Sequence, residues 1–142
     1  MYYFAYGSNM NLEHMRRLCG WHVKVLGVAT MADYELGPDT RGFANVRPCA
    51  GKKVYGVLFE VDQHCVDILD DFEGYPEVFG RPELTVTDSN NKAYKAWVYV
   101  EKPNEFGGTY IKADYMRRVL AGAQENRLPE EWIEFLMSFV TK

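Results

Sequence analysis

The sequence is poor in cysteine, lacks long apolar runs and carries no excess of positive charge. Its three cysteines, Cys19, Cys49 and Cys65, are odd in number and show no CxxC spacing. We therefore expect a reduced, cytoplasmic protein with neither a disulfide framework nor a zinc site. No segment approaches the ~20 apolar residues that cross a bilayer, and the N-terminal residues lack the basic region of a signal peptide. A net charge of −4 without a Lys/Arg cluster argues against nucleic-acid binding.

Nothing in the composition divides the chain, so we expect one domain over residues 1–142. Apolar residues make up 47% and charged residues 25% of the sequence, which is enough for a packed core. The ten tyrosines and eight phenylalanines exceed what a small core needs. Because a tyrosine combines an apolar ring with a polar tip, this surplus indicates a concave binding site.

The patterns of apolar residues predict more strands than helices. Strands are expected over 2–6, 23–36, 43–47, 54–61, 83–88 and 93–101, and helices over 11–19, 62–74, 113–124 and 130–140. Asn11 and Asp62 precede helical patterns as N-caps, and Gly74 follows one as a C-terminal stop. The strands gather in the middle of the chain. This order predicts an α+β fold with a largely antiparallel sheet, which a barrel could close.

The first segment that could carry chemistry is Tyr6-Gly7-Ser8-Asn9, between the first strand and the first helix. A strand that turns through glycine into a helix presents free backbone N–H groups, which suit a carboxylate or an oxyanion. Ser8 and Asn9 would add side-chain donors. The alternative is an ordinary turn, since these residue types are common in turns.

The second segment is Asp70-Asp71-Phe72-Glu73-Gly74, at the end of a predicted helix. The helix dipole and the negative charge of Asp70 both disfavour an ionised Glu73, and burial by tyrosines would add to their effect. All three would raise the pKa of Glu73, making it a competent general base near neutral pH. The alternative is a solvated acidic helix end.

Other chemistries find less support. Ser8 lacks a GxSxG context, the cysteines fall on apolar helix faces or beside a proline, and the three histidines form no metal-like cluster. Tyr115 lies on an apolar helix face, so it matters for function only if it shares a cavity with Glu73.

Together these segments resemble the γ-glutamylcyclotransferase (AIG2-like) family. Phe4 to Asn9 is similar to the family's first-strand signature, and Val54 to Glu60 to its central strand. Leu69 to Gly74 matches the LDxxEG segment that bears the catalytic glutamate of the family. Gly122 to Pro129 is similar to a stretch of the cyclotransferases of glutathione metabolism. The four segments follow the order of the family.

The resemblance implies a small mixed, largely antiparallel β-barrel flanked by helices. It implies a lyase-type enzyme that converts a γ-glutamyl amino acid or amine to 5-oxoproline and the free amine by intramolecular acyl transfer. Glu73 would be the catalytic acid/base, and Tyr6, Gly7, Ser8, Asn9 and Tyr115 would bind substrate. No metal and no cofactor are implied, and the small-molecule substrate is the partner. The oligomeric state stays open, a homodimer being one option.

Two departures from the family leave the leaving amine open. Ile111 and Lys112 replace a Pro-Ser pair that often precedes the tyrosine matching Tyr115, and Phe79 replaces a tyrosine that often follows the glutamate. One alternative is therefore an enzyme for another γ-glutamyl compound, such as a γ-glutamyl-lysine amine or a natural-product intermediate. Another is a non-enzymatic module that binds small carboxylates. Under the enzymatic hypothesis, Tyr75 and Tyr115 are candidates to line the cavity around Glu73.

Overall fold

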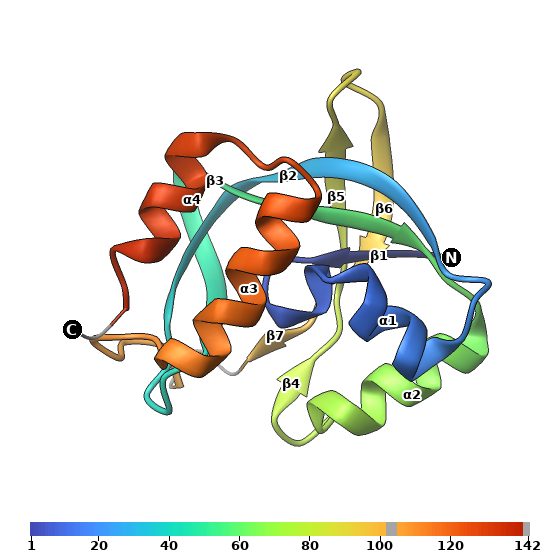
Figure 1. Cartoon of the computed structure of the whole chain (residues 1–142), viewed down its shortest axis with the longest axis horizontal. Helices are drawn as coiled ribbons and strands as arrows, with labels where there is room; N and C mark the ends of the chain where they lie inside the picture. Colours follow the sequence, from blue (N-terminus) through green and yellow to red (C-terminus); the bar gives the residue numbers. More distant parts are fainter. Residues whose placement is uncertain (102–104, 141–142) are drawn as a thin grey trace.

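A computed structural model describes residues 1–101 and 105–140, and its centre is a closed five-stranded barrel (Figure 1). The strands follow one another around the barrel in the order β1-β3-β2-β5-β6. Their bounds are β1 Tyr2–Ala5, β2 Lys24–Pro38, β3 Ala44–Glu60, β5 Glu83–Asp88 and β6 Ala93–Trp97. A separate two-stranded sheet pairs β4, Phe79–Gly80, with β7, Val100–Glu101. The predicted α+β class and largely antiparallel barrel are confirmed.

The long hairpin of β2 and β3 provides most of the barrel wall. Its antiparallel register runs from Lys24 opposite Glu60 to Pro38 opposite Ala44, with irregularities at Gly27 and near Asp33. β1 pairs with β3 on one side and meets β6 in parallel at Tyr3 and Trp97, which closes the barrel. Because β1 ends at Ala5 within this wall, the residues that follow it leave from the rim of the barrel.

Two strand predictions need correction. The strands expected over 43–47 and 54–61 are one strand, since β3 continues through Pro48. Residues 44–53 of β3 pair only with β2, and a proline is tolerated where a strand has no neighbour on its other side. The strand expected over 93–101 is divided into β6 and β7, which belong to different sheets.

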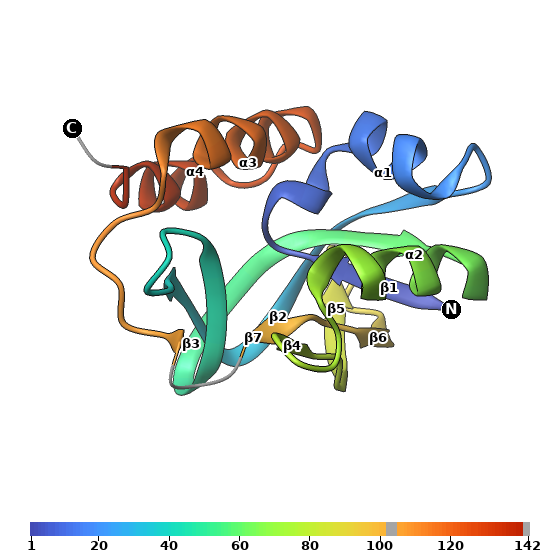
Figure 2. The same ribbon diagram turned by 90° about the horizontal axis from the view of Figure 1, so that it is seen from below.

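Four α-helices flank the barrel, and their ends agree with the predicted caps. They are α1 Leu12–Cys19, α2 Gln63–Glu73, α3 Ala113–Glu125 and α4 Glu130–Met137, and a 3-10 turn, η1 Ser8–Met10, precedes α1. Asn11 and Asp62 accept hydrogen bonds from the backbone N–H groups of His14 and Cys65, and Gly74 is left-handed with φ 73°. α3 and α4 lie side by side, whereas α1 and α2 pack together at the other end of the molecule (Figures 1 and 2). None of the helices in 1–101 and 105–140 is both long and apolar enough to span a membrane.

The core lies inside the barrel and between the barrel and its helices. Both faces of the C-terminal half of β3 are buried, with Val57 and Phe59 on one face and Leu58 on the other. This explains why that segment is almost continuously apolar. Met10 and Met15 fill the space between the barrel and the helices.

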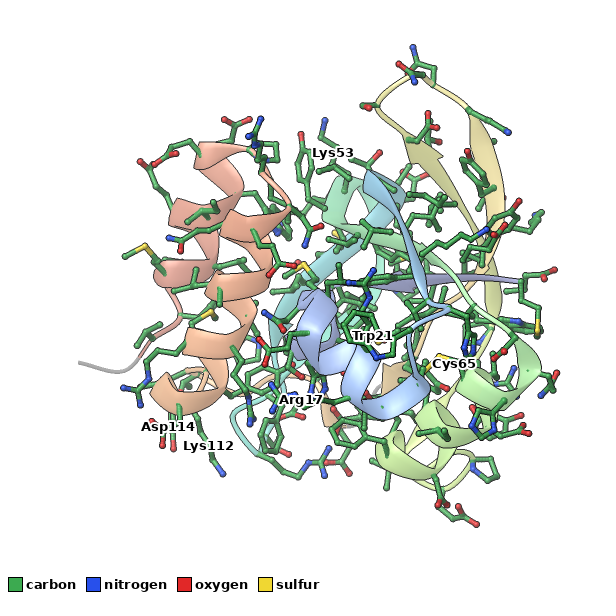
Figure 3. The ribbon with its side chains drawn as sticks, turned by 45° about the vertical axis from the view of Figure 1, so that its right-hand side comes forward. Arg17, Trp21, Lys53, Cys65, Lys112 and Asp114 are labelled. Carbon is green, nitrogen blue, oxygen red and sulfur yellow. A yellow bond between two sulfur atoms is a disulfide. The ribbon has the colours of Figure 1, made fainter. Side chains whose placement is uncertain are left out.

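The expectation that the cysteines form no disulfide is wrong. Cys19, at the end of α1, and Cys65, in the first turn of α2, are joined by a disulfide, which Figure 3 shows as the yellow bond near the Cys65 label. Both lie on buried helix faces, as the sequence predicts. The sequence pattern could not show that these faces meet. Cys49 is unpaired in the described part of the chain.

Candidate active site

A cavity of about 450 Å³ lies among the end of β1, the end of α2, the β2–β3 connection and α3. This volume falls within the range of small-molecule sites. All six residues that the sequence singled out for function contribute to its walls: Tyr6, Gly7, Ser8, Asn9, Glu73 and Tyr115. The structure thus brings together three segments that are more than 40 residues apart in the sequence.

Glu73 is the last residue of α2, and its side chain is partly buried. Its Oε1 accepts a hydrogen bond from Nδ2 of Asn9 at 3.0 Å. Burial raises the pKa of Glu73 to about 7, although the Asn9 hydrogen bond and the positive charge of Arg41 act in the opposite direction. At neutral pH this carboxyl group can therefore both accept and return a proton.

The cause of the raised pKa differs in part from the prediction. Asp70 does not act on Glu73 as expected, because its carboxylate is held by Arg81 through two hydrogen bonds of 2.7 and 3.0 Å. It also accepts a hydrogen bond of 2.7 Å from the Tyr99 hydroxyl. Desolvation, not repulsion within the acidic cluster, is the main reason that Glu73 binds its proton tightly.

The Gly7–Asn9 segment lies against Tyr115 of α3. A methyl group on Gly7 would be placed 2.5 Å from the Tyr115 hydroxyl, so this approach requires glycine. Burial and the negative charge of Glu73 raise the pKa of Tyr115 to about 12, while the backbone N–H groups of Ser8 and Ala44 act against them. Tyr115 therefore keeps its proton at neutral pH.

Two tyrosines differ from their predicted arrangement. Tyr6 lines the cavity, but its hydroxyl donates a 2.6 Å hydrogen bond to the carbonyl of Tyr99, so the ring and not the hydroxyl is available to a ligand. Tyr75 does not line the cavity, contrary to expectation. Tyr75 is 39% exposed, and the Cζ of Arg81 lies 4.7 Å from the centre of the Tyr75 ring.

Arg41, which no sequence pattern indicates as functional, lines the cavity from the β2–β3 connection. Its Nη2 lies 3.0 Å from Oε1 of Glu101 and 3.5 Å from Oδ2 of Asp39, two fully buried carboxyl groups. Burial and the neighbouring Asp39 raise the pKa of Glu101 to about 8, against the effect of Arg41. No local pattern in the sequence indicates this cluster, because it joins residues 60 positions apart.

Tyr3 and His14, which the sequence does not mark as functional, both contact the side chain of Asn9. Nδ2 of Asn9 donates to the Tyr3 hydroxyl at 2.9 Å, and Oδ1 of Asn9 lies 2.9 Å from Nε2 of His14. His14 is one helical turn after the Asn11 cap, where helix geometry turns it toward the loop. The spacing of the histidines indicates neither a metal site nor a partner for Ser8, and it gives no sign of a contact with Asn9.

Of the three departures from the family, only Phe79 lines the cavity. Lys112 lies just before α3, next to the Asp114 label in Figure 3, and its Nζ is 5.0 Å from the ring centre of Phe43, a lining residue. Ile111 is fully buried and does not reach the cavity, whereas Phe79 is one of its walls.

The cavity offers acid/base chemistry and anion binding from protein groups. Within 1–101 and 105–140, no three histidine, cysteine, aspartate or glutamate side chains are grouped as metal ligands. Glu73 can take a proton from a bound cationic amine, while Arg41 and Arg118 supply positive charge to the same cavity. Polar groups from several elements thus converge around a pocket with aromatic walls.

Comparison with known proteins identifies a family. Residues 3–117 match the family model described as gamma-glutamyl cyclotransferase, AIG2-like. Gamma-glutamylaminecyclotransferase A of Danio rerio is 37% identical over 54 residues, which are 37% of this chain and 34% of the relative. Gamma-glutamylcyclotransferase of Bos taurus is 27% identical over 147 residues, covering 96% of this chain and 77% of the relative. The match to the Danio rerio protein thus spans about a third of that relative's length.

A solved structure named gamma-glutamyl cyclotransferase shares the fold. It superposes with a TM-score of 0.88 at 23% sequence identity, covering 98% of this chain and 87% of that chain. At this identity the likeness is one of fold.

Proposed function

Because the chain belongs to the gamma-glutamyl cyclotransferase, AIG2-like family, we propose that it releases 5-oxoproline from a γ-glutamyl amino acid or γ-glutamyl amine. In this reaction the α-amino nitrogen of the glutamyl group attacks its own γ-carbonyl carbon. A new C–N bond closes the five-membered ring, the original amide C–N bond breaks, and the amine leaves. No water is consumed.

Glu73 moves the proton in this mechanism. The α-ammonium group must lose a proton before its nitrogen can attack, and the ionised Glu73 accepts it. The protonated Glu73 then gives this proton to the leaving nitrogen as the amide C–N bond breaks. The ring nitrogen still carries one proton more than the lactam, and the ionised Glu73 removes it and passes it to the released amine, which leaves as an ammonium ion. A carboxyl group with a pKa of about 7 suits these steps, since each form is populated at neutral pH.

The remaining groups hold the substrate in a folded conformation. Ring closure within one molecule requires little more than the correct conformer, and a cavity with aromatic walls favours it. In this proposal the backbone N–H groups of the Gly7–Asn9 segment bind the glutamyl carboxylate or the developing oxyanion. The protonated Tyr115 hydroxyl adds a donor on the same side, and the Tyr6 ring forms part of the wall.

One observation supports this proposal above the others. The hydrogen bond between Asn9 Nδ2 and Glu73 Oε1, at 3.0 Å, places the proposed base and the proposed binding loop in one cavity. A small molecule can thus contact both at once. A solvated acidic helix end would not have a carboxyl group with a pKa near 7.

A second candidate is an enzyme restricted to γ-glutamyl amines. The relative from Danio rerio is named a γ-glutamylaminecyclotransferase, which favours this narrower substrate class. The cations that line the cavity, Arg41 and Arg118, favour instead a leaving group with its own carboxylate.

The experiment is incubation with matched substrates. γ-Glutamylalanine, γ-glutamylethylamine and Nε-(γ-glutamyl)lysine differ in the charge and length of the leaving amine, and mass spectrometry measures 5-oxoproline and the amine. We expect equimolar release of both products from at least one substrate. Turnover of γ-glutamylethylamine and Nε-(γ-glutamyl)lysine without turnover of γ-glutamylalanine would select the second candidate. Tight binding of 5-oxoproline with no turnover would contradict both and indicate a binding module.

The cellular setting belongs to the same proposal. Action on γ-glutamyl compounds places the protein in glutathione metabolism, and we propose a cytoplasmic location. Disulfides are rare in reducing compartments, so the Cys19–Cys65 disulfide stands against a cytoplasmic location, and the oxidised fraction of this pair in the cell tests that location. Alkylation of acid-quenched cells followed by mass spectrometry measures the fraction of this pair that is oxidised.

A further inference from the structure

His14 is connected to Glu73 through the side chain of Asn9. Nε2 of His14 lies 2.9 Å from Oδ1 of Asn9, and Nδ2 of Asn9 lies 3.0 Å from Oε1 of Glu73. The second hydrogen on Nδ2 is used as well, because Nδ2 donates to the Tyr3 hydroxyl at 2.9 Å. The three side chains come from α1, η1 and α2, so the connection joins all the elements on this side of the cavity.

The chemistry of the contact between His14 and Asn9 fixes which group donates the hydrogen bond. An amide oxygen carries no hydrogen, so Nε2 of His14 must be the donor to Oδ1 of Asn9. The amide nitrogen of Asn9 then has one possible direction, toward Glu73 and Tyr3. If the amide rotated by half a turn, its oxygen would face Glu73 and its nitrogen would face the N–H of His14.

Positively charged side chains from two helices act on His14, at one end of the connection. Arg17 on α1 and Arg118 on α3 act on His14, and with burial, the largest cause, they lower its pKa below the ordinary value. The ring of Phe72 on α2 contacts it edge-on at 5.6 Å between ring centres. His14 is therefore neutral at pH 7 and adds no charge of its own.

Three charged side chains, Arg41, Arg118 and Asp71, line the cavity around the other end of the connection at Glu73. Arg41 and the Asn9 amide stabilise its ionised form, and the uncharged hydroxyl groups of Tyr3 and Tyr115 line the same cavity.

We propose that His14 is a positioning residue for Glu73: it holds the Asn9 amide so that Nδ2 donates to the carboxylate. The contribution of His14 to catalysis rests on the proposed function, but the effect of His14 on the protonation of Glu73 does not. The Asn9 hydrogen bond favours the ionised carboxylate. Without the His14 donor, the amide can turn its oxygen toward Glu73 and accept a hydrogen bond from the protonated acid. The loss of His14 therefore raises the affinity of Glu73 for its proton.

Titration of the Glu73 carboxyl carbon by NMR tests this directly, and assignment by Glu73→Gln identifies the signal. His14→Phe keeps a ring against Phe72 and removes the donor, whereas His14→Gln offers an amide nitrogen near the same position. We expect the titration midpoint to rise in His14→Phe and to return toward the wild-type value in His14→Gln. The exposed His64 gives the control His64→Leu, which should leave the midpoint unchanged. His14→Leu replaces His14→Phe if the latter does not fold.

The Asn9→Ala background tests whether the effect passes through Asn9. His14→Phe should shift the midpoint in wild type and cause no further shift in Asn9→Ala, because the relay is already broken. Equal shifts in both backgrounds, or none in wild type, would overturn the proposal.

Kinetics distinguishes this inference from the proposed function. With a substrate that is turned over, His14→Phe should lower kcat/KM about five- to tenfold at pH 7. The acidic limb of its pH profile should move to higher pH, which a mere loss of folded protein would not cause. If no substrate is turned over, the proposed function fails, while the NMR titration still decides the role of His14. A lower kcat/KM with an unmoved limb and an unmoved midpoint would contradict the positioning role.

Discussion

Gly7 leaves the space that Tyr115 occupies at the cavity wall. We predict that Gly7→Ala displaces the Tyr115 hydroxyl, because the added methyl group would lie 2.5 Å from it. Under the proposed function, kcat/KM should fall about tenfold or more, since a displacement of about 1 Å is costly in a preorganised site. Steady-state kinetics on the preferred γ-glutamyl substrate measures this change.

Gly80→Ala is the matched control for this substitution. A methyl group there makes only an ordinary contact of 3.7 Å with the carbonyl of Val100, so kcat/KM should stay within twofold, roughly, of wild type. Equal kinetic losses in Gly7→Ala and Gly80→Ala would show that the close approach to Tyr115 has no special role.

At the residue scale, sequence predicted the groups that belong to local motifs. Gly7 and Glu73 are singled out because each stands in a recognisable segment with a chemical rationale, and both line the cavity. Arg41 and His14 were missed because their importance depends on contacts with Glu101 and Asn9. A single sequence does not show which distant side chains meet in space.

The Cys19–Cys65 disulfide connects the two helices that adjoin the proposed site. The bond joins the end of α1, which follows the binding loop, to the first turn of α2, which ends at Glu73. The bond closes a sequence separation of 46 residues. Since a loop of this size restricts the unfolded chain, reduction should lower the free energy of unfolding by about 3–4 kcal/mol.

Urea unfolding with and without a thiol reductant measures this loss of stability. The Cys49→Ser variant, whose thiol is unpaired in the described part of the chain, should show the same dependence on reductant as wild type. Cys19→Ser/Cys65→Ser should show none. A wild-type midpoint that does not respond to complete reduction would contradict the prediction.

At the scale of elements, local signals predicted helices better than strands. Asp62 and Gly74 mark the ends of α2 because capping acts within a few residues. The sequence predicts a strand that ends before Pro48, because it does not show that residues 44–53 lack a neighbouring strand on one side. The division of 93–101 into β6 and β7 likewise depends on the distant partners β5 and β4.

At the scale of the whole molecule, two carboxyl groups bind their protons more tightly in the folded than in the unfolded protein. The pKa values of Glu73 and Glu101 are raised from 4.5 to about 7 and about 8. Their contribution to stability is fully present below about pH 4.5 and is lost as the pH rises through the folded pKa values. Between pH 6.5 and 8.5 the melting temperature should therefore fall, by about 5 °C.

Thermal unfolding across this pH range checks the prediction. Glu101→Gln should flatten the dependence, because the amide cannot ionise, whereas Glu77→Gln at an exposed position should leave it unchanged. A melting temperature that rises with pH over this range would mean that neither carboxyl group holds its proton in the folded state.

The central claim is that Glu73 carries the proton in a γ-glutamyl cyclotransfer reaction. The most direct measurement is the rate of 5-oxoproline formation by wild type, Glu73→Gln and the exposed control Glu77→Gln under identical conditions. Glu73→Gln keeps the shape of the side chain and removes the base, so its kcat should fall at least about 100-fold, with Glu77→Gln equal to wild type. A folded Glu73→Gln variant that forms 5-oxoproline at the wild-type rate would contradict the account.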